Sequence, residues 1–426
     1  MKVIKYPSRS QWNEILERPV MNIDKLRDTV CSVLAEIKSD GDKAVKKYEL
    51  MFDKVQLDSL QVSEAEIEEA EKLIDPKLRE ALVLAHSNIS KFHEAQKFEP
   101  IKVETQPGVV CWQKSVAIEK VGLYIPGGTA PLFSTVLMLA TPAKIAGCKE
   151  IVLCTPPSKD GKVNPAILCA AKVAGVSKIF KIGGVQAIGA MAYGTESVIK
   201  VDKIFGPGNQ FVMAAKQQVS LSDVAIDMPA GPSEVEVLAD AQSNPVFIAA
   251  DLLSQAEHGA DSQVLLVSTS EELIEKVQQE VEKQLNELPR KEIAEKALQN
   301  SRLVVVKDME EAIEMTNEYA PEHLILSNAD YKEVAERITH AGSVFMGQYS
   351  CESAGDYASG TNHTLPTKGY AKAYSGLCLD SFVRKMTFQE LTAEGIRNIG
   401  AAVEIMAANE QLDAHKNAMT VRLKTV

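Results

Sequence analysis

Apolar residues recur along the chain with periods that differ from one region to the next. Across residues 22–96 the period is that of helices, and Ser63 followed by Glu66 has the pattern of a capping box at a helix start. Residues 101–124 instead alternate in short β-rich runs. From Val121 onward, short apolar runs lead into glycine-containing turns and then into helical stretches, several times in succession. This alternation predicts right-handed βαβ units and parallel sheets.

The alternation breaks near residue 230, which favours two successive α/β blocks over one continuous sheet. Residues 1–20 have little pattern of their own and are interpreted as an arm. In the second block, a long charged helix is expected at about 270–298, and residues 347–376 are expected to form a long ordered loop. The tail from Ser381 is predicted to be helical again.

Composition and charge narrow the class of protein. The 426 residues carry a formal net charge of −12 at pH 7, which argues against nucleic acid or an anionic membrane as the main partner, since both attract basic patches. The N-terminus lacks the apolar segment of a signal peptide, and no apolar run approaches the length of a membrane span. The seven cysteines are scattered and nowhere form C-x-x-C, which favours reduced thiols in a cytoplasmic protein.

A helix near the middle of the chain has side chains that could bind a ligand at its end. Asn244 suits the N-cap, Pro245 suits the first helical position, and Gly259 is a plausible stop. Gln255 and His258 are three residues apart, so both would project from the last turn. On spacing alone, a surface glutamine and a capping histidine are the favoured interpretation.

Four polar side chains form a candidate metal site: Gln255, His258, Asp356 and His415. Two imidazoles and two hard oxygens suit zinc or a similar first-row ion better than calcium or magnesium. The alternative is that these are unrelated polar residues, far apart in the sequence, and without further information the sequence favours that alternative.

The segment Pro321-Glu322-His323 stands just before an apolar strand. A carboxylate and an imidazole in this position could act as bases toward water and toward an alcohol proton. Successive side chains of a regular strand face opposite ways. Glu322 and His323 can therefore serve one site only if the strand has not yet begun there.

Glycine turns and cysteines supply the remaining candidates. The turns could bind nucleotide phosphates at helix N-termini. None matches G-x-G-x-x-G, however, since the central one has Gly183, Gly184 and then Gly189, and tight turns need glycine with or without a ligand. Cys111 and Cys148 are conceivable nucleophiles, but neither has a neighbouring feature that would lower its pKa, which favours a packing role.

Seven segments, in order and spread over nearly the whole chain, resemble the histidinol dehydrogenase family. They are Val121-Gly-Leu-Tyr-Ile-Pro-Gly-Gly, Gly184-Val-Gln-Ala-Ile, Phe205-Gly-Pro-Gly-Asn, Asp227-Met-Pro-Ala-Gly-Pro-Ser-Glu, Leu252-Leu-Ser-Gln-Ala-Glu-His-Gly, Ala320-Pro-Glu-His-Leu and Ala414-His-Lys-Asn. One such motif would be weak support, whereas seven in register are strong support.

The resemblance implies NAD-dependent oxidation of L-histidinol through L-histidinaldehyde to L-histidine, the last two steps of histidine biosynthesis. It implies one zinc ion per subunit, bound by Gln255, His258, Asp356 and His415. It implies an acid–base pair formed by Glu322 and His323, and NAD contacts from Tyr124, Gln186 and Asn209. The implied substrate contacts are the metal ligands together with Ser233, His323 and Glu410. In this scheme His323 takes the alcohol proton and Glu322 activates water.

The resemblance also implies an architecture of two incomplete Rossmann-like parallel-sheet domains, one inserted in the other, with small N- and C-terminal helical pieces. The corresponding division is an arm at 1–20, a substrate and metal domain from 21–125 and 232–376, an inserted NAD domain at 126–231, and a C-terminal piece at 377–426 that carries a metal ligand. A homodimer with shared active sites is expected.

Other functions remain open from the sequence. Sulfopropanediol dehydrogenases share the implied fold and metal ligands but oxidise another small alcohol; His323, Ser233 and Glu410 favour histidinol. A zinc hydrolase could use the same ligands, with Glu322 activating water. A non-catalytic nucleotide-binding module would leave the polar residues from 255 to 415 unexplained.

Overall fold

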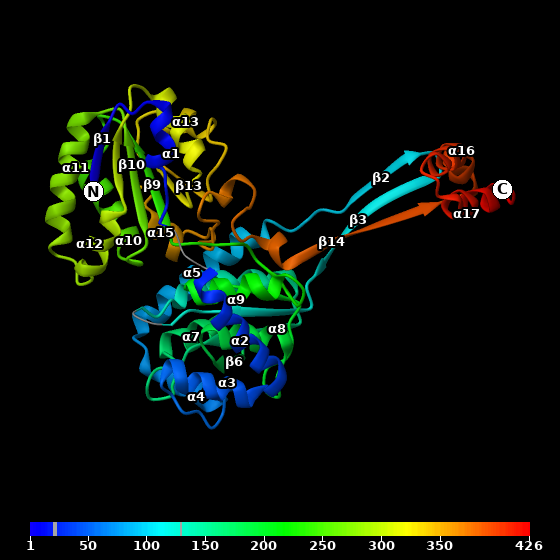
Figure 1. Ribbon diagram of the computed structural model, residues 1–426, viewed down its shortest axis with the longest axis horizontal. Coiled ribbons are helices and arrows are strands. Elements are labelled where there is room, and N and C mark those ends of the chain that lie inside the picture. Colours follow the sequence, from blue (N-terminus) through cyan, green and yellow to red (C-terminus); the bar gives the residue numbers. More distant parts are fainter. Residues whose placement is uncertain (20–23, 128–129) are drawn as a thin grey trace.

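Two parallel sheets and a separate antiparallel sheet organise the chain in the computed structural model (Figure 1), which describes residues 1–19, 24–127 and 130–426. Asn22, in the predicted helical region, and Gly128, in a predicted glycine turn, lie outside the described residues. The predicted α/β class with parallel sheets is confirmed.

The larger sheet contains six parallel strands in the order β1-β11-β10-β9-β12-β13. Their bounds are Lys2–Lys5 (β1), Glu234–Ala239 (β9), Gln263–Ser268 (β10), Arg302–Val305 (β11), His323–Leu326 (β12) and Ser343–Met346 (β13). One face packs against α10 (Pro245–Ala256), α11 (Glu271–Leu285) and α12 (Lys291–Gln299). The other face packs against α13 (Met309–Tyr319), α14 (Tyr331–Ala335) and α1 (Trp12–Ile15), which follows the turn η1 (Arg9–Gln11).

Two predictions for this part of the chain are wrong. The prediction of an arm at 1–20 is not met in the described residues 1–19, because β1 pairs with β11 at the edge of the sheet and Trp12 is buried. Only two residues of β1, Val3 and Ile4, are apolar, which is too short a pattern to identify a strand. The helix expected at 270–298 is two helices, α11 and α12, since Pro289 between them cannot donate the backbone hydrogen bond that a continuous helix requires.

The smaller sheet contains five parallel strands in the order β6-β5-β4-β7-β8. Their bounds are Lys120–Tyr124 (β4), Glu150–Thr155 (β5), Lys178–Lys181 (β6), Lys203–Phe205 (β7) and Ala225–Ile226 (β8). One face packs against α4 (Glu64–Leu73), α5 (Pro76–Glu94), α6 (Phe133–Ala146) and α7 (Pro165–Val173). The other packs against α2 (Asp24–Asp40), α3 (Asp42–Tyr48), α8 (Gly184–Tyr193) and α9 (Gln210–Ser220).

The packing of the early helices differs from the predicted grouping of 21–125 with 232–376. Helices α2 to α5 bury their apolar faces against the five-stranded sheet and its helices, not against the six-stranded sheet. An apolar helix face indicates that something covers it, but its period carries no information on which sheet does so. The rest of the predicted division into domains stays a prediction.

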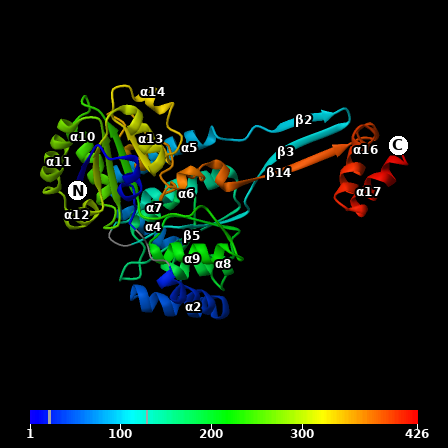
Figure 2. The same ribbon diagram turned by 45° about the horizontal axis from the view of Figure 1, so that its top comes forward.

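An extended unit projects away from both parallel sheets (Figures 1 and 2). Its antiparallel strands are β2 (Ile101–Gln106), β3 (Val109–Ala117) and β14 (Val383–Leu391), with β3 in the middle. The 3-10 turn η4 (Leu379–Phe382) leads into β14, and the distal end holds α16 (Ala393–Asn409) and α17 (Asp413–Leu423). We call this unit the projecting arm. The tail from Ser381 is therefore not purely helical, because β14 comes first and pairs along the whole of β3.

The loop predicted at 347–376 contains two short regular elements. These are α15 (Glu352–Tyr357) and the 3-10 turn η3 (Tyr370–Lys372). A five-residue π-helical turn, η2 (Glu49–Asp53), directly follows α3. Among the described residues, no helix is both long enough and apolar enough to cross a lipid bilayer.

Candidate functional site

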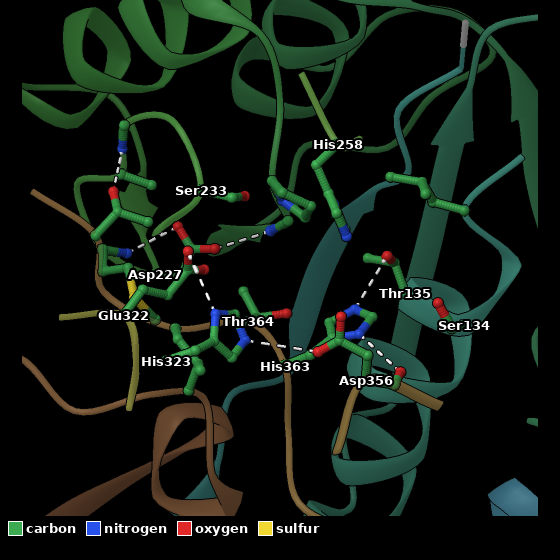
Figure 3. Close-up of a pocket in the computed structure, with 18 of the residues that line it drawn as sticks. Ser134, Thr135, Asp227, Ser233, His258, Glu322, His323, Asp356, His363 and Thr364 are labelled. Carbon is green, nitrogen blue, oxygen red and sulfur yellow. Dashed lines mark hydrogen bonds and ion pairs between the residues drawn. The ribbon is translucent and has the colours of Figure 1, made fainter. Parts of the chain in front are cut away.

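A pocket lies between the six-stranded sheet and helix α6 of the five-stranded unit (Figure 3). It is lined from both sides by residues that include Ser134, Thr135, Asp227, Ser233, Gln255, His258, Glu322, His323, Asp356 and His363. Five predicted site residues from three separate stretches of the chain therefore lie in one pocket, together with Ser233. They are Gln255, His258, Glu322, His323 and Asp356. The loop that precedes β9 supplies Ser233.

Helix α10 delivers Gln255 to the pocket. Its start is as predicted, with Pro245 first in the helix and the Asn244 side chain accepting a hydrogen bond from the N–H of Val246 at 2.9 Å. The helix ends at Ala256, earlier than the predicted stop, so His258 projects from the following turn and not from the helix itself. Gln255 is fully buried and His258 is exposed.

Glu322 and His323 face the same pocket because β12 begins only at His323. The Glu322 carboxylate (Oε2) accepts a hydrogen bond from the backbone N–H of Glu234 at 2.8 Å and lies 3.6 Å from His323 Nδ1. The geometric condition derived from the sequence is thereby confirmed.

The hydrogen bonding of His323 assigns its tautomer. Its Nδ1 donates to the backbone carbonyl of Glu234 at 3.2 Å, and a carbonyl can only accept. In the neutral ring, Nε2 is therefore the unprotonated nitrogen, and it points toward Asp356 Oδ1 at 3.5 Å. Burial lowers the pKa of His323, but the carboxylates of Glu352, Glu322 and Asp356 outweigh it and raise that pKa well above its usual value.

Two side chains that line the pocket, His258 and Asp356, and the buried Glu352 beside them are placed to bind a cation. One ligand atom each of His258, Glu352 and Asp356 lies within 4.8 Å of the others. Asp356 Oδ1 and His323 Nε2 are buried and have no hydrogen-bond partner. Burial raises the pKa of Asp356, but the imidazoles of His323, His363 and His258 lower it below its usual value, which favours the ionised form. Unpartnered nitrogen and oxygen donors of this kind fit a zinc ion.

Glu352 was missed in the sequence. It is one helical turn before Asp356 on α15, so the two carboxylates share a face of that helix. The side-chain amide of Gln255 lies against the Glu352 carboxylate and the backbone N–H of Glu234. Burial raises the pKa of Glu352 well above its usual value. The four-residue spacing to Asp356 was the available signal, but a glutamate in a polar loop is ordinarily solvated.

His363 was also missed, and it connects the two sides of the pocket. Its Nδ1 bonds to the backbone carbonyl of Asp356 at 2.9 Å, and its Nε2 lies 3.1 Å from the hydroxyl of Thr135 on α6. Burial lowers the pKa of His363, which favours the neutral ring.

A buried ion pair fixes the floor of the pocket. Lys216 Nζ donates to the carbonyl of Gly206 at 2.7 Å and lies 2.5 Å from Asp227 Oδ1, and both side chains are about 1% exposed. Asp227 Oδ2 also accepts the N–H of Gly206 at 2.8 Å. Gly206 has φ +123°, and a Cβ there would lie 2.1 Å from the carbonyl oxygen of Tyr124, so this loop requires glycine.

The three predicted NAD contacts lie along the five-stranded sheet, where β4, β6 and β7 lead into loops and helices. The Tyr124 hydroxyl accepts the N–H of Gly184 at 3.1 Å, and the Asn209 side chain caps α9. Gln186 Nε2 donates to Glu49 at 2.9 Å and to Asp53 at 3.2 Å, while its Oε1 is buried without a partner. Ligands of doubly wound sheets bind at this carboxyl edge.

Two predicted site residues are not brought to the pocket within one chain. Glu410 follows α16 and His415 lies on α17, both exposed at the distal end of the projecting arm (Figure 1).

The cysteines have no part in the pocket. Among the described residues that line it there is no cysteine. Cys148 is buried, and burial raises the pKa of its thiol to about 11. Cys111 lies on β3 of the projecting arm. Both observations agree with the packing role predicted for these thiols.

The pocket combines side chains that can accept protons with side chains that can coordinate a cation, on a framework of parallel α/β units. These features place the chain among metal-dependent α/β enzymes. Comparison with protein families identifies one family. The chain belongs to the histidinol dehydrogenase family, whose model matches residues 16–423. It is accordingly an NAD-dependent oxidoreductase of the final steps of histidine biosynthesis, in a family that uses zinc.

Individual relatives agree with this assignment. The chain is 69% identical to the histidinol dehydrogenase of Bacteroides fragilis (strain YCH46) over 426 residues, which is 100% of both chains. It is 52% identical to that of Escherichia coli (strain K12) over 419 residues, 98% of this chain and 96% of the relative. The crystal structure of histidinol dehydrogenase from Elizabethkingia anophelis has a TM-score of 0.98 at 54% identity and covers 100% of this chain and 98% of that one.

Proposed function

We propose that this chain oxidises L-histidinol through L-histidinaldehyde to L-histidine in the pocket described above. The observation that carries the proposal is that Glu322 and His323 both face a pocket whose other polar side chains can bind a cation. One such group could serve the alcohol step and the other the aldehyde step. Free thiols at all seven cysteines support a reducing, cytoplasmic location.

We propose that Gln255, His258 and Asp356 bind the zinc ion, with His415 as a further ligand. A bound zinc ion would supply a Lewis-acid centre with free coordination positions, suited to the imidazole and amine nitrogens of histidinol. The buried Oδ1 of Asp356 supports this assignment, since it has no hydrogen-bond partner and its one ion-pair contact is with His323 Nε2 at 3.5 Å.

His323 acts first in the proposed sequence. Its Nε2 accepts the hydroxyl proton of histidinol while hydride leaves the carbinol carbon for the nicotinamide ring. This step requires a neutral imidazole, and a cation bound by Asp356 would offset the carboxylate charge that raises the pKa of His323. In the neutral ring, the hydrogen bond from Nδ1 to the Glu234 carbonyl keeps Nδ1 protonated and leaves Nε2 free. Glu322 acts second: its carboxylate takes a proton from water that adds to the aldehyde. A second hydride then leaves the hydrate for a second NAD, and a hydroxyl proton of the hydrate is lost as the acid forms. Ser233 and Glu410 are proposed to contact the substrate.

We propose that NAD binds along the carboxyl edge of the five-stranded sheet through Tyr124, Gln186 and Asn209. The buried, unpartnered Oε1 of Gln186 supports a polar ligand there. The position of Asn209 at the start of α9 supports the approach of an anionic group, because helix N-termini attract negative charge.

A homodimer with shared sites is proposed for a geometric reason. Glu410 and His415 are exposed on the projecting arm, at a distance from the pocket of their own chain (Figure 1). The arm also exposes large apolar side chains, including Ile405 and Met406, which are 63% and 64% exposed. Arms that cover each other's pockets would bury these side chains and complete each site.

Complementation between two variants tests the shared site. His258→Ala and His415→Ala are each expected to be inactive. If one subunit supplies His258 and the other His415, unfolding and refolding the two variants together should restore about a quarter of the wild-type activity, because half of the dimers then hold one unaltered site. A mixture that stays inactive although heterodimers form would contradict the sharing.

The activity itself is tested by NAD reduction with L-histidinol, with metal content measured on the same sample. We expect NADH formation, its loss after chelation and its recovery with zinc. Sulfopropanediol in place of histidinol distinguishes the related alcohol dehydrogenase. Absence of histidinol-dependent NADH formation by a zinc-loaded sample would contradict the proposal.

A further inference from the structure

We propose that Arg18 is a positioning residue for Glu322 and His323, which it holds in place through Glu234. Arg18 follows α1 in the N-terminal segment and is far in the sequence from every candidate site residue. The inference rests on the proposed roles of Glu322 and His323.

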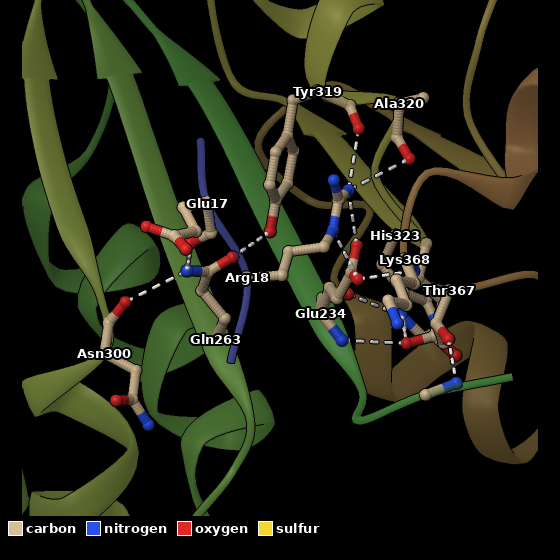
Figure 4. Close-up of polar contacts among 12 residues, drawn as sticks. Glu17, Arg18, Glu234, Gln263, Asn300, Tyr319, Ala320, His323, Thr367 and Lys368 are labelled. Atoms are coloured by element: carbon tan, nitrogen blue, oxygen red, sulfur yellow. Dashed lines mark hydrogen bonds and ion pairs between the residues drawn. The ribbon is translucent and has the colours of Figure 1, made fainter. Parts of the chain in front are cut away.

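Arg18 makes a two-pronged ion pair with Glu234 at the start of β9 (Figure 4). Its Nε donates to Oε1 at 2.7 Å and its Nη2 to Oε2 at 2.9 Å. The backbone N–H of Lys368 donates to Oε1 of the same carboxylate at 2.6 Å. The Glu234 side chain is only 3% exposed. With these bonds both carboxylate oxygens are fixed, and Glu234 cannot rotate without breaking all of them.

The backbone of Glu234 then orients both candidate catalytic side chains. Its N–H donates to Glu322 Oε2 at 2.8 Å, and its carbonyl accepts from His323 Nδ1 at 3.2 Å. The first bond sets the direction of the carboxylate, and the second sets the tautomer of the imidazole. A shift of this one peptide segment would therefore displace the proposed base for water and the proposed base for the alcohol together.

Arg18 also holds the chain that leads into Glu322. Its Nη2 donates to the carbonyls of Tyr319 at 2.7 Å and Ala320 at 3.4 Å, and its guanidinium lies over the Tyr319 ring, 3.9 Å from the centroid. Ala320 has φ +52°, a left-handed conformation that residues with a Cβ rarely adopt. Such a conformation persists only where surrounding contacts enforce it. Arg18 is thus bonded to both segments that converge on the candidate pair.

A role in stability alone accounts poorly for this arrangement. A buried ion pair is often no more stabilising than apolar side chains of similar volume, because both charges lose their hydration. The pair instead fixes the orientation of the Glu234 carboxylate, because a planar guanidinium forms two parallel hydrogen bonds with a carboxylate and a lysine ammonium does not.

The experiment compares Arg18→Met, Arg18→Lys and Arg18→Ala with a matched control, Arg9→Met, in the zinc-loaded full chain. Arg9 belongs to the same N-terminal segment, lies 4.2 Å over the Trp12 ring and forms an ion pair with Glu314, but this pair is on the surface. Steady-state kcat and KM for L-histidinol are measured together with zinc content and the thermal unfolding temperature.

We expect Arg18→Met to lower kcat on the order of 100-fold, the loss typical of a displacement of about 1 Å in a reacting group. KM for NAD should change by less than about threefold and zinc content should be unchanged, because Arg18 contacts none of the proposed ligands of either. Arg18→Lys should fall between Arg18→Met and the wild type. Guanidinium ion at millimolar concentration should restore part of the kcat of Arg18→Ala, and Arg9→Met should match the wild type.

The outcomes separate the two proposals. Wild-type histidinol oxidation together with a kcat of Arg18→Met within about twofold of it would overturn the positioning role alone. A fall in activity that only follows the loss of folded protein or bound zinc would overturn it as well. If Arg18→Met and Arg18→Ala do not fold, an Arg18→Lys variant that folds with unchanged kcat would still overturn it. A wild type without histidinol-dependent NADH formation would overturn the proposed function, and this inference with it.

Discussion

Replacement of Glu322 by glutamine separates the two oxidation steps. The carboxylate oxygen that accepts the Glu234 N–H at 2.8 Å can be replaced by an amide oxygen of the same shape, so the side chain should keep its place. The amide can no longer take a proton from water. The His323 ring keeps its own bond to the Glu234 carbonyl, so the tautomer needed for the alcohol step is preserved.

The expected losses differ between the steps. A positioned general base contributes about 10²–10⁴-fold, or roughly 3–5 kcal/mol of transition-state stabilisation, and that amount should be lost from aldehyde oxidation. Alcohol oxidation should fall by less than about tenfold, because the only change near His323 is the loss of a carboxylate charge 3.6 Å from Nδ1.

The assay follows each half-reaction separately by NADH absorbance, with L-histidinol and with L-histidinaldehyde as the starting substrate. In a single turnover from histidinol, the variant should release one NADH quickly and the second slowly. Zinc content and thermal unfolding of the variant serve as controls. Equal losses in the two half-reactions, in a variant that is folded and zinc-loaded, would refute the division of labour between Glu322 and His323.

Three further predictions concern buried groups. Lys216→Met leaves the Asp227 carboxylate buried without its cation, so it should cost about 3–5 kcal/mol and lower the urea midpoint, and adding Asp227→Asn should recover much of the loss; an unchanged midpoint would contradict this. Burial raises the pKa of Glu236 from 4.5 to about 8, so the folded state binds more protons than the unfolded state in that window and stability falls as pH rises through it. The urea midpoint of Glu236→Gln should therefore fall less than that of the wild type between those two pH values, and parallel curves would refute the assignment. Cys148→Ala should keep kcat within about twofold, since the thiol is buried and protonated; a larger loss would argue for a catalytic thiol.

The parts of the fold that could be predicted are those with local signals. Asn244 and Pro245 mark the start of α10 through contacts within one helical turn, and the structure has them there. The glycine turns after β4, β6 and β7 likewise identified the parallel sheet. By contrast, β14 pairs with β3 from Val383 opposite Ala117 onward, a contact between distant parts of the chain that no local period encodes. Which of the two parallel sheets helices α2 to α5 pack against also depends on contacts between distant parts of the chain.

The candidate site divides in a similar way. Gln255, His258 and the Glu322–His323 pair sit at element ends, where the sequence pattern is informative, and they meet in the pocket. Glu352 and the acids of η2, Glu49 and Asp53, could not be identified, because a carboxylate in a polar or helical stretch is ordinarily solvated. Only the packing of other elements buries Glu49 and Glu352 and partly covers Asp53. Burial raises the pKa of Glu49 to about 7.

Hydride transfer requires the two sides of the pocket to be held together. The proposed NAD contacts belong to the unit of the five-stranded sheet, whereas Gln255, His258 and Asp356, the proposed metal ligands in the pocket, belong to the unit of the six-stranded sheet. His363 spans that gap. A backbone carbonyl can only accept, so Nδ1 of His363 donates to Asp356, and in the neutral ring Nε2 accepts from the Thr135 hydroxyl. One ring therefore ties the helix that bears a candidate metal ligand to α6 of the NAD-side unit. Since a displacement of about 1 Å can cost on the order of 100-fold in rate, a rigid tie of this kind matters to the reaction without touching the reacting atoms.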